Sequence, residues 1–201
     1  MKSILFSLTL ALLAFSPVQA AETILFDGSS LEAFDMQTGH EGHWRIEDGV
    51  LHYDGKSEAQ DKNLWSREAF DDLKLTLDWR WAENASHKTM RPVLDPETGE
   101  AIKDSKGKAV KVMVDELDSG IYLRGNSTSQ VNLWNWPCGS GEVYGYRMNQ
   151  KLPQKVRAAL TPRTNADKPI GQWNHMVIEL KGDRLDVHLN DKHVIRNAQL
   201  P

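Results

Sequence analysis

Regular alternation of apolar and polar residues is the feature that most limits how this chain can fold. From Leu73 to Trp81 every second residue is apolar and the residues between are polar, which is the period of a half-buried β-strand. The same period recurs from Asn174 to Val194, interrupted by turn residues at Gly182-Asp183 and Asn190-Asp191. The pattern therefore predicts a β-hairpin in this part of the chain, followed by a further turn.

Shorter segments extend this pattern along the chain. We expect further strands at residues 24–26, 43–46, 50–53, 120–124, 130–134 and 142–146. Only residues 154–160 favour a short helix. Because many short strands follow one another without helices between them, the sequence predicts an all-β fold, with two antiparallel sheets packed face to face as a sandwich or jelly roll.

One segment, Glu83 to Asp115, interrupts the alternation with charged, turn-forming residues (DPETGE and KDSKGKA), and we interpret it as an inserted hairpin. The chain has 201 residues, of which 40% are hydrophobic and 26% charged, enough for one substantial core. We therefore expect a single domain over residues 21–201. The net charge of −4 and the lack of a Lys/Arg run argue against nucleic acid as a partner.

The first 20 residues have the features of a secretory signal peptide. One lysine precedes an apolar run from Ile4 to Phe15, and Val18-Gln19-Ala20 resembles a cleavage site. We expect the mature chain to begin at Ala21, to have no membrane span and to be periplasmic or secreted; a retained N-terminal anchor is the alternative. The single cysteine, Cys138, cannot form an internal disulfide and has no base nearby in sequence, so we interpret it as a packed loop thiol.

Aromatic and amide side chains are concentrated between Ser129 and Tyr146. The strand period turns Val131 and Leu133 toward a core. The other face then carries Gln130, Asn132, Trp134 and Trp136. Because sugars present apolar C–H faces beside hydroxyl groups, flat rings interleaved with amides suit them as ligands. We therefore predict a carbohydrate-binding face here, and a second core layer or an interface is the alternative.

Charged residues and tyrosines flank this aromatic face. In DSGIYLRG, one face of the predicted strand carries Asp118, Tyr122 and Arg124. The guanidinium of Arg124 has fixed donors suited to an oxyanion or a carboxylate. In GEVYGY, Glu142 and Tyr144 share a face. We expect the carboxylate of Glu142 to lie within reach of Arg124; a surface salt bridge is the alternative role for Arg124.

Several short segments occur in the order found in one known family. They are FDG at 26–28, Trp44 followed by GVL at 49–51, LWS at 64–66, SGIYLRG at 119–125, GEVYG at 141–145 and WN at 173–174. On these segments, from Ile24 to Asn190, the chain resembles the 3-keto-disaccharide hydrolase domain family. The resemblance implies a concanavalin A-like jelly roll with its ligand on the concave sheet. Many relatives carry a glutamate where this chain has Gln130, so no carboxylate role is carried over to that position.

The resemblance also implies a reaction, the cleavage of glycosides already oxidised to a ketone at C3. The ketone acidifies the C2 proton, so a base can remove it and the C1 aglycone can leave before water adds. On this hypothesis Arg124 stabilises the C3 oxyanion and Glu142 or Asp118 transfers the proton. Tyr144 or Tyr122 protonates the leaving oxygen. The sugar is held by Tyr122, Gln130, Asn132, Trp134 and Trp136.

Other enzymatic sites are compatible with parts of the sequence. A retaining glucanase of this superfamily needs Glu-x-Asp-x-x-Glu, but Glu116 and Asp118 are followed by Ile121 where the last carboxylate should stand. His40 and His43 in HEGH, or Glu116 and Asp118 with a histidine, could hold a divalent metal. The spacing does not require a metal, and no cofactor is required by the sequence.

Two non-catalytic functions also stay open. A lectin-like carbohydrate-binding module would use the tryptophans and amides but has no use for a buried pair of Arg124 and Glu142. A structural or adhesive envelope domain would leave the same surface inert to sugars.

Overall fold

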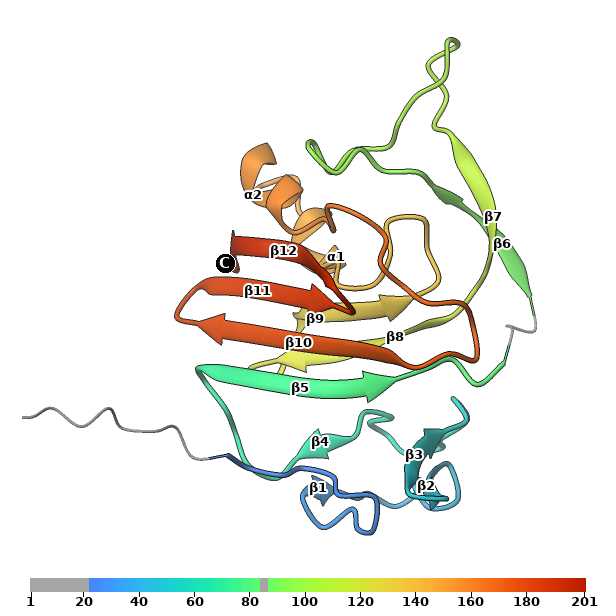
Figure 1. The fold of residues 1–201 in the computed structure, drawn as a ribbon, viewed down its shortest axis with the longest axis vertical. Coiled ribbons are helices and arrows are strands. Elements are labelled where there is room, and N and C mark those ends of the chain that lie inside the picture. The colour runs from blue at the N-terminus through green and yellow to red at the C-terminus, as the bar shows by residue number, and fades with distance from the viewer. Residues whose placement is uncertain (1–21, 84–86) are drawn as a thin grey trace, which may run out of the picture. The chain divides into compact units, whose positions relative to one another are not determined.

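The computed structural model describes residues 22–83 and 87–201 (Figure 1). The predicted signal peptide, residues 1–20, lies outside the described residues. The chain divides into two compact units, one ending at Glu68 and the other running from Ala69 to Pro201. Among the described residues, no helix has the length and apolar character needed to cross a membrane.

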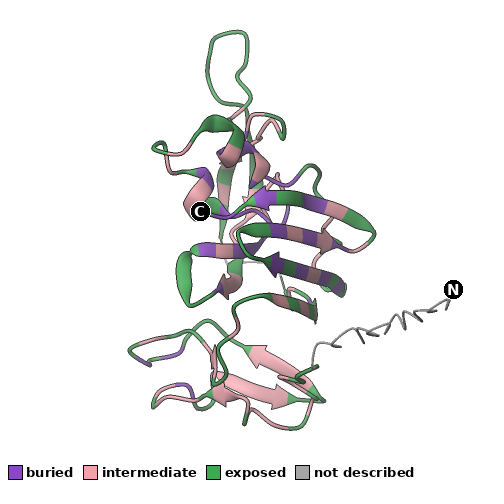
Figure 2. Ribbon diagram, turned by 90° about the vertical axis from the view of Figure 1, so that its left-hand side faces the viewer, coloured by how far each residue is buried: buried purple, intermediate pink, exposed green. Residues whose placement is uncertain are grey.

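A four-stranded antiparallel sheet forms the larger part of the core of the second unit. Its strand order is β12 (Lys192–Gln199), β11 (Arg184–Leu189), β10 (Asn174–Lys181) and β5 (Leu73–Trp79). The register pairs apolar residues of β10 with apolar residues of β5, so that both strands present them on one face. Figure 2 shows the resulting alternation of burial along these strands. The strands and hairpin predicted from the alternation are therefore confirmed.

A second layer covers the apolar face of this sheet. It is the antiparallel hairpin of β8 (Asp118–Leu123) and β9 (Asn126–Trp134). Leu123, Val131 and Leu133 are at most 7% exposed and belong to the same buried cluster as the apolar residues of β10, β11 and β12. Burial of this cluster stabilises the unit by about 25 cal/mol per Å² of apolar surface removed from water. The predicted all-β sandwich of antiparallel sheets is confirmed.

The inserted segment forms a hairpin beside the sandwich, as predicted. Strand β6 (Lys88–Pro92) pairs antiparallel with β7 (Lys111–Asp115), and isolated bridges at Leu94–Ala101 and Lys103–Ala109 continue the pairing. Figure 1 shows this hairpin extending beyond the edge of the sandwich. Because β6 and β7 pair only with each other, the hairpin adds a separate wall to the second unit.

The first unit contains two small antiparallel sheets. Strand β1 (Phe34–Asp35) pairs with β4 (Trp65–Ser66), and β2 (Trp44–Glu47) pairs with β3 (Val50–Tyr53). The turn between β2 and β3 has positive φ at both Asp48 and Gly49, which matches the twist of a two-residue hairpin. The strands predicted at 43–46 and 50–53 are thus confirmed to within one residue.

Two predicted strands are absent from the structure. Residues 24–26 pair with no other described segment, and Ile24 is 72% exposed. Residues 142–146 also form no strand, because Tyr144–Arg147 forms the single-turn helix α1. Gly145 of this helix lies so close to Thr128 that an added Cβ would sit 2.5 Å from the Thr128 carbonyl oxygen, so only glycine fits there. Helix α2 (Gln154–Ala159) matches the predicted helix at 154–160.

Candidate active site

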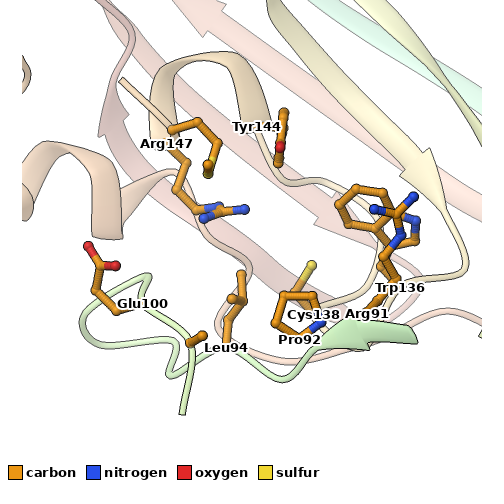
Figure 3. Close-up of a pocket in the computed structure, with 10 residues that line it drawn as sticks. Arg91, Pro92, Leu94, Glu100, Trp136, Cys138, Tyr144 and Arg147 are labelled. Carbon is orange, nitrogen blue, oxygen red and sulfur yellow. The ribbon is translucent and has the colours of Figure 1, made fainter. Parts of the chain in front are cut away.

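A cavity of about 250 Å³ lies in the second unit, between the inserted hairpin and the segment that follows β9 (Figure 3). This volume is just below the range of about 300–1,000 Å³ typical of drug-sized ligands, so it suits a single sugar ring. The lining residues are Arg91, Pro92, Leu94, Glu100, Ala101, Trp136, Cys138, Tyr144, Arg147 and Met148. Two of them, Trp136 and Tyr144, belong to the aromatic segment that the sequence predicts as a sugar-binding face.

The aromatic side of the cavity is a compact group of three rings. Trp136 stacks on Trp134 with ring centroids 3.8 Å apart, and Tyr144 meets both rings edge-on at 5.8 Å. Trp134 is only 2% exposed and its indole N–H donates to the Gly139 carbonyl at 2.8 Å. The structure therefore places Trp134 behind Trp136 as its support, while Trp136 and Tyr144 face the cavity.

Two guanidinium groups line the same cavity. The Arg91 guanidinium lies 4.0 Å from the centre of the Trp136 ring and donates from Nε to Glu116 Oε2 at 3.0 Å. The Arg147 guanidinium lies 5.2 Å from the centre of the Tyr144 ring. Arginine suits this position because its planar fork stays charged and offers several donors. The cavity thus combines aromatic faces with fixed positive charge.

A buried ion pair holds Arg147 in place. Its Nε contacts Glu142 Oε1, and its Nη1 donates to the Gly99 carbonyl at 3.4 Å. Glu142 is fully buried, and the Cys138 thiol lies 3.6 Å from Glu142 Oε2. Glu142 is therefore separated from the cavity by two of the residues that line it, Arg147 and Cys138. The guanidinium partner of Glu142 is Arg147 and is not the predicted Arg124.

Burial changes the acidity of this group of residues. It raises the pKa of Glu142 from 4.5 to about 7, although the neighbouring Arg147 guanidinium acts in the opposite direction. Burial, followed by the nearby Glu142 carboxylate, also raises the pKa of the Cys138 thiol. A thiol held neutral is a poor nucleophile, which agrees with the interpretation of Cys138 as a packed loop residue.

The raised pKa of Glu142 predicts a stability that depends on pH. Between about pH 4.5 and pH 7 the folded chain retains a proton that the unfolded chain has released, so this group stabilises the fold less as the pH rises through 7. We expect wild type to lose on the order of 3 kcal/mol relative to Glu142→Gln between pH 4 and pH 8. Urea unfolding of both proteins across this range measures the difference. Parallel stability curves for the two proteins would contradict the prediction.

The predicted amide residues support β9 instead of lining the cavity. Asn132 is buried, and its side-chain amide donates to the Glu142 carbonyl at 2.9 Å and to the Gln130 carbonyl at 3.3 Å. The Gln130 side chain covers Gly120 on β8, where a Cβ would lie 2.5 Å from Gln130 Nε2. Tyr122 lies opposite Gln130 in the β8–β9 register. These three residues are outside the cavity lining.

Arg124 lies at the turn between β8 and β9, at the end of the hairpin opposite Trp134. It has a positive φ of 52° and donates to the backbone carbonyls of Gly182 at 2.7 Å and Asp71 at 3.1 Å. It also forms ion pairs with Asp71 at 2.7 Å and Asp72 at 3.3 Å. The structure does not bring Arg124 close to Glu142. Its ion pairs with Asp71 and Asp72 correspond to the alternative role, a surface salt bridge.

These contacts predict a structural effect of replacing Arg124. We expect Arg124→Gln to lower the free energy of unfolding by about 1–3 kcal/mol, because its charged hydrogen bonds to the residues just before β5 and just after β10 are lost. We expect cleavage of a 3-keto-glycoside, the reaction that the sequence resemblance implies, to stay within about twofold of wild type. Urea unfolding and steady-state kinetics measure the two effects. A large loss of turnover in a folded variant would restore Arg124 to the active site.

Asp118 begins β8, where the register pairs it with Trp134. Partial burial raises its pKa, the Glu116 carboxylate raises it further, and Arg91 lowers it. Asp118 does not line the cavity. The electrostatic effect of Arg91, which does line the cavity, connects Asp118 to the site indirectly.

The histidines proposed as metal ligands have other partners. His40 is buried, accepts at Nδ1 from the Gln37 N–H at 3.2 Å and contacts the Asp61 carbonyl through Nε2 at 2.7 Å. His43 Nδ1 lies 3.0 Å from both carboxylate oxygens of Asp54. In residues 22–83 and 87–201, no group of three or more His, Cys, Asp or Glu side chains is arranged to hold a metal ion.

The charged residues of the cavity lining, Arg91, Glu100 and Arg147, were not predicted from the sequence. Arg147 follows GEVYGY directly, and a helical reading of that segment would have placed it three residues from Tyr144 on the same face. Arg91 and Glu100 come from the inserted hairpin. No local pattern connects that hairpin with the aromatic segment, because the contact depends on how the hairpin folds back.

Comparisons with known proteins assign the chain to a family. The family model of the 3-keto-alpha-glucoside-1,2-lyase-like domain matches residues 21–201, which includes both units. No curated protein matches the chain. Ten chains of solved structures match. One of these is a candidate glycosyl hydrolase from Parabacteroides distasonis, 18% identical with a TM-score of 0.46, and the match covers 86% of this chain and 70% of that chain. The chain therefore belongs to the 3-keto-alpha-glucoside-1,2-lyase-like domain family.

Proposed function

We propose that this chain cleaves the C1–O bond of 3-keto-α-glucosides in the cavity beside Trp136, and that it does so after export to the periplasm or the cell exterior. The family match supports the substrate class. The observation that carries the proposal is the lining of the cavity, where two guanidinium groups, a carboxylate and a phenol surround a space suited to one sugar ring. No metal or organic cofactor is part of the proposal.

The proposed reaction begins with removal of the proton at C2. The electron pair of the C2–H bond moves to form an enediolate, with negative charge on the C3 oxygen. When the ketone re-forms, the C1–O bond breaks, a double bond forms between C1 and C2, and the leaving oxygen takes a proton. Addition of water at C1 then gives 3-keto-glucose, whereas release before water adds gives the unsaturated sugar. The site must therefore supply a base, an oxyanion partner and an acid.

Each requirement has a candidate among the cavity residues. Among the described residues that line the cavity, Glu100 is the only carboxylate, so we assign it the removal of the C2 proton. Its Oε1 accepts from Arg157 Nη1 at 2.8 Å. Arg147 and Arg91 stabilise the C3 oxyanion. Tyr144 protonates the leaving oxygen, and Trp136 offers a ring face to the sugar. Glu142, assigned proton transfer on sequence grounds, becomes a positioning residue that holds the Arg147 guanidinium.

The proposal is tested by product analysis. The exported chain is incubated with a methyl 3-keto-α-glucoside and with the unoxidised methyl α-glucoside, each with and without EDTA. We expect methanol to be released from the keto form alone, at the same rate with and without EDTA. Saturable binding of the keto sugar without cleavage would overturn the enzymatic proposal in favour of a lectin-like module. Cleavage of both compounds would indicate an ordinary glycosidase.

The assignment of Tyr144 predicts a moderate kinetic effect. We expect Tyr144→Phe to lower kcat roughly tenfold to a hundredfold, which is at or below the lower end of the range for general-acid catalysis, because Tyr144 is 38% exposed and water can also protonate the leaving oxygen. The matched control is Tyr146→Phe on the same helix, whose hydroxyl accepts from Asn126 Nδ2 at 3.2 Å. Stopped-flow or steady-state rates for both variants measure the effect. Equal rates in both would remove Tyr144 from the mechanism.

A further inference from the structure

We propose that the leaving group this cavity accepts best is an apolar alcohol, alkyl or aryl, and not a second sugar. The inference rests on the proposed function and concerns one wall of the same cavity. The inserted hairpin contributes Pro92, Leu94 and Ala101 to the lining, and Met148 at the end of α1 adds a fourth apolar side chain. Figure 3 shows Pro92 and Leu94 on the side of the cavity opposite Tyr144 and Arg147.

The four apolar side chains of this wall have no group that donates a hydrogen bond to a ligand. Pro92 has no N–H. The N–H of Val93 donates to Val110 and that of Ile102 donates to Val93, each at 2.9 Å, while the N–H of Asp95 donates to Glu100 at 2.9 Å. These N–H groups therefore form their hydrogen bonds within the hairpin. A second sugar placed against these side chains would lose water from its hydroxyl groups and gain few partners in return, which is unfavourable.

The opposite walls of the cavity suit different parts of a glycoside. The sugar ring needs the charged and aromatic side, formed by Trp136, Tyr144 and Arg147. Because the cavity has room for about one ring, the leaving group must lie toward the rim. At the rim, Met148 is 45% exposed, and its flexible thioether can adapt to apolar groups of different shapes. An apolar leaving group would cover this surface and Leu94, which also lines the cavity.

The test is a series of 3-keto-α-glucosides with methyl, butyl and hexyl leaving groups. The methyl compound releases methanol and the other two release simple primary alcohols. Chain length therefore changes the apolar contact area more than the acidity of the leaving alcohol. We expect kcat/KM to rise along the series, by up to about fourfold for each methylene that becomes fully buried. Met148→Gln and Leu94→Asn should flatten this rise while the methyl compound is still cleaved. The control is Met113→Gln on β7, which is 59% exposed and does not line the cavity.

The outcomes separate this inference from the proposed function. Failure to cleave any compound in the series, the methyl glucoside included, would defeat the proposed function. Cleavage of all three at equal kcat/KM, or a 3-keto-disaccharide that outperforms the hexyl compound, would overturn the apolar leaving group and leave the function intact. If kcat/KM of Met148→Gln rose with the length of the leaving group as steeply as kcat/KM of wild type, the apolar leaving group would also be overturned. Met148 is exposed at the end of its helix, so this variant decides the question even if Leu94→Asn does not fold.

Discussion

Arg147→Gln is expected to lower kcat for a 3-keto-α-glucoside by about 10²–10³-fold, the usual cost of removing one donor that stabilises an oxyanion. The expectation follows from the geometry of the guanidinium. Arg147 lines the cavity beside Tyr144, and its orientation is fixed by Glu142 on one side and the Gly99 carbonyl on the other. A charge held in place before the reaction needs no reorganisation when the enediolate forms.

The same substitution alters stability, so a second variant is needed. Removing one partner of a buried ion pair costs about 3–5 kcal/mol, because the other charge is left buried without compensation. In Arg147→Gln the remaining Glu142 can take up a proton, since its pKa is already raised to about 7, and this reduces the loss. The double variant Arg147→Gln/Glu142→Gln replaces the ion pair with two neutral amides that can hydrogen-bond to each other.

We expect the double variant to regain most of the stability but none of the rate. Urea unfolding gives the first quantity and steady-state turnover gives the second. Glu142→Gln alone serves as the matched control, because it keeps the Arg147 charge and should retain more activity than either Arg147 variant. Recovery of wild-type turnover in the double variant would mean that Arg147 acts only through the fold.

Glu100→Gln is expected to lower kcat by about 10²–10⁴-fold, because it removes the proposed base while keeping the size and shape of the side chain. Glu100 forms an ion pair with Arg157, whose side chain is only 9% exposed, but the glutamine oxygen can still accept from Arg157, so we expect a stability loss of about 1–3 kcal/mol. A large loss of rate in a stable protein would therefore report on chemistry.

The inserted hairpin supplies the control for Glu100. Glu97 lies three residues earlier in the same turn region, is exposed and does not line the cavity. Glu97→Gln should leave kcat and stability close to wild type. If Glu100→Gln is as active as Glu97→Gln, the base is a different residue, and Asp118 and Glu142 become the next carboxylates to replace.

The β-sheets could be predicted because their signal is local. Alternation along β5 and from β10 to β11 gives the strand period and identifies the buried face without knowledge of the rest of the fold. For the segment after β9, the same alternation gave a wrong prediction, a strand at residues 142–146. Glu142 and Tyr144 fit a period of two, but residues 144–147 form the helix α1, and Arg147 of this helix lines the cavity.

The candidate site was predicted only in part, for a related reason. The aromatic residues Trp136 and Tyr144 belong to one continuous segment, so their association is visible in the sequence. The predicted approach of Arg124 to Glu142 depends on how two separate segments lie relative to each other, and the alternation pattern carries no information about that. The β8–β9 register instead places Arg124 at the far end of the hairpin from Trp134. The contributions of Arg91 and Glu100 depend on an insertion that folds back over the aromatic segment.

The most direct test of the central claim, removal of the C2 proton in this cavity, uses a methyl 3-keto-α-glucoside carrying deuterium at C2. The account predicts that methanol release is slower than from the protonated compound and that the 3-keto-glucose formed has lost deuterium to the solvent. Equal rates together with full retention of deuterium in the product would show that the C1–O bond breaks without removal of the C2 proton, and would contradict the account.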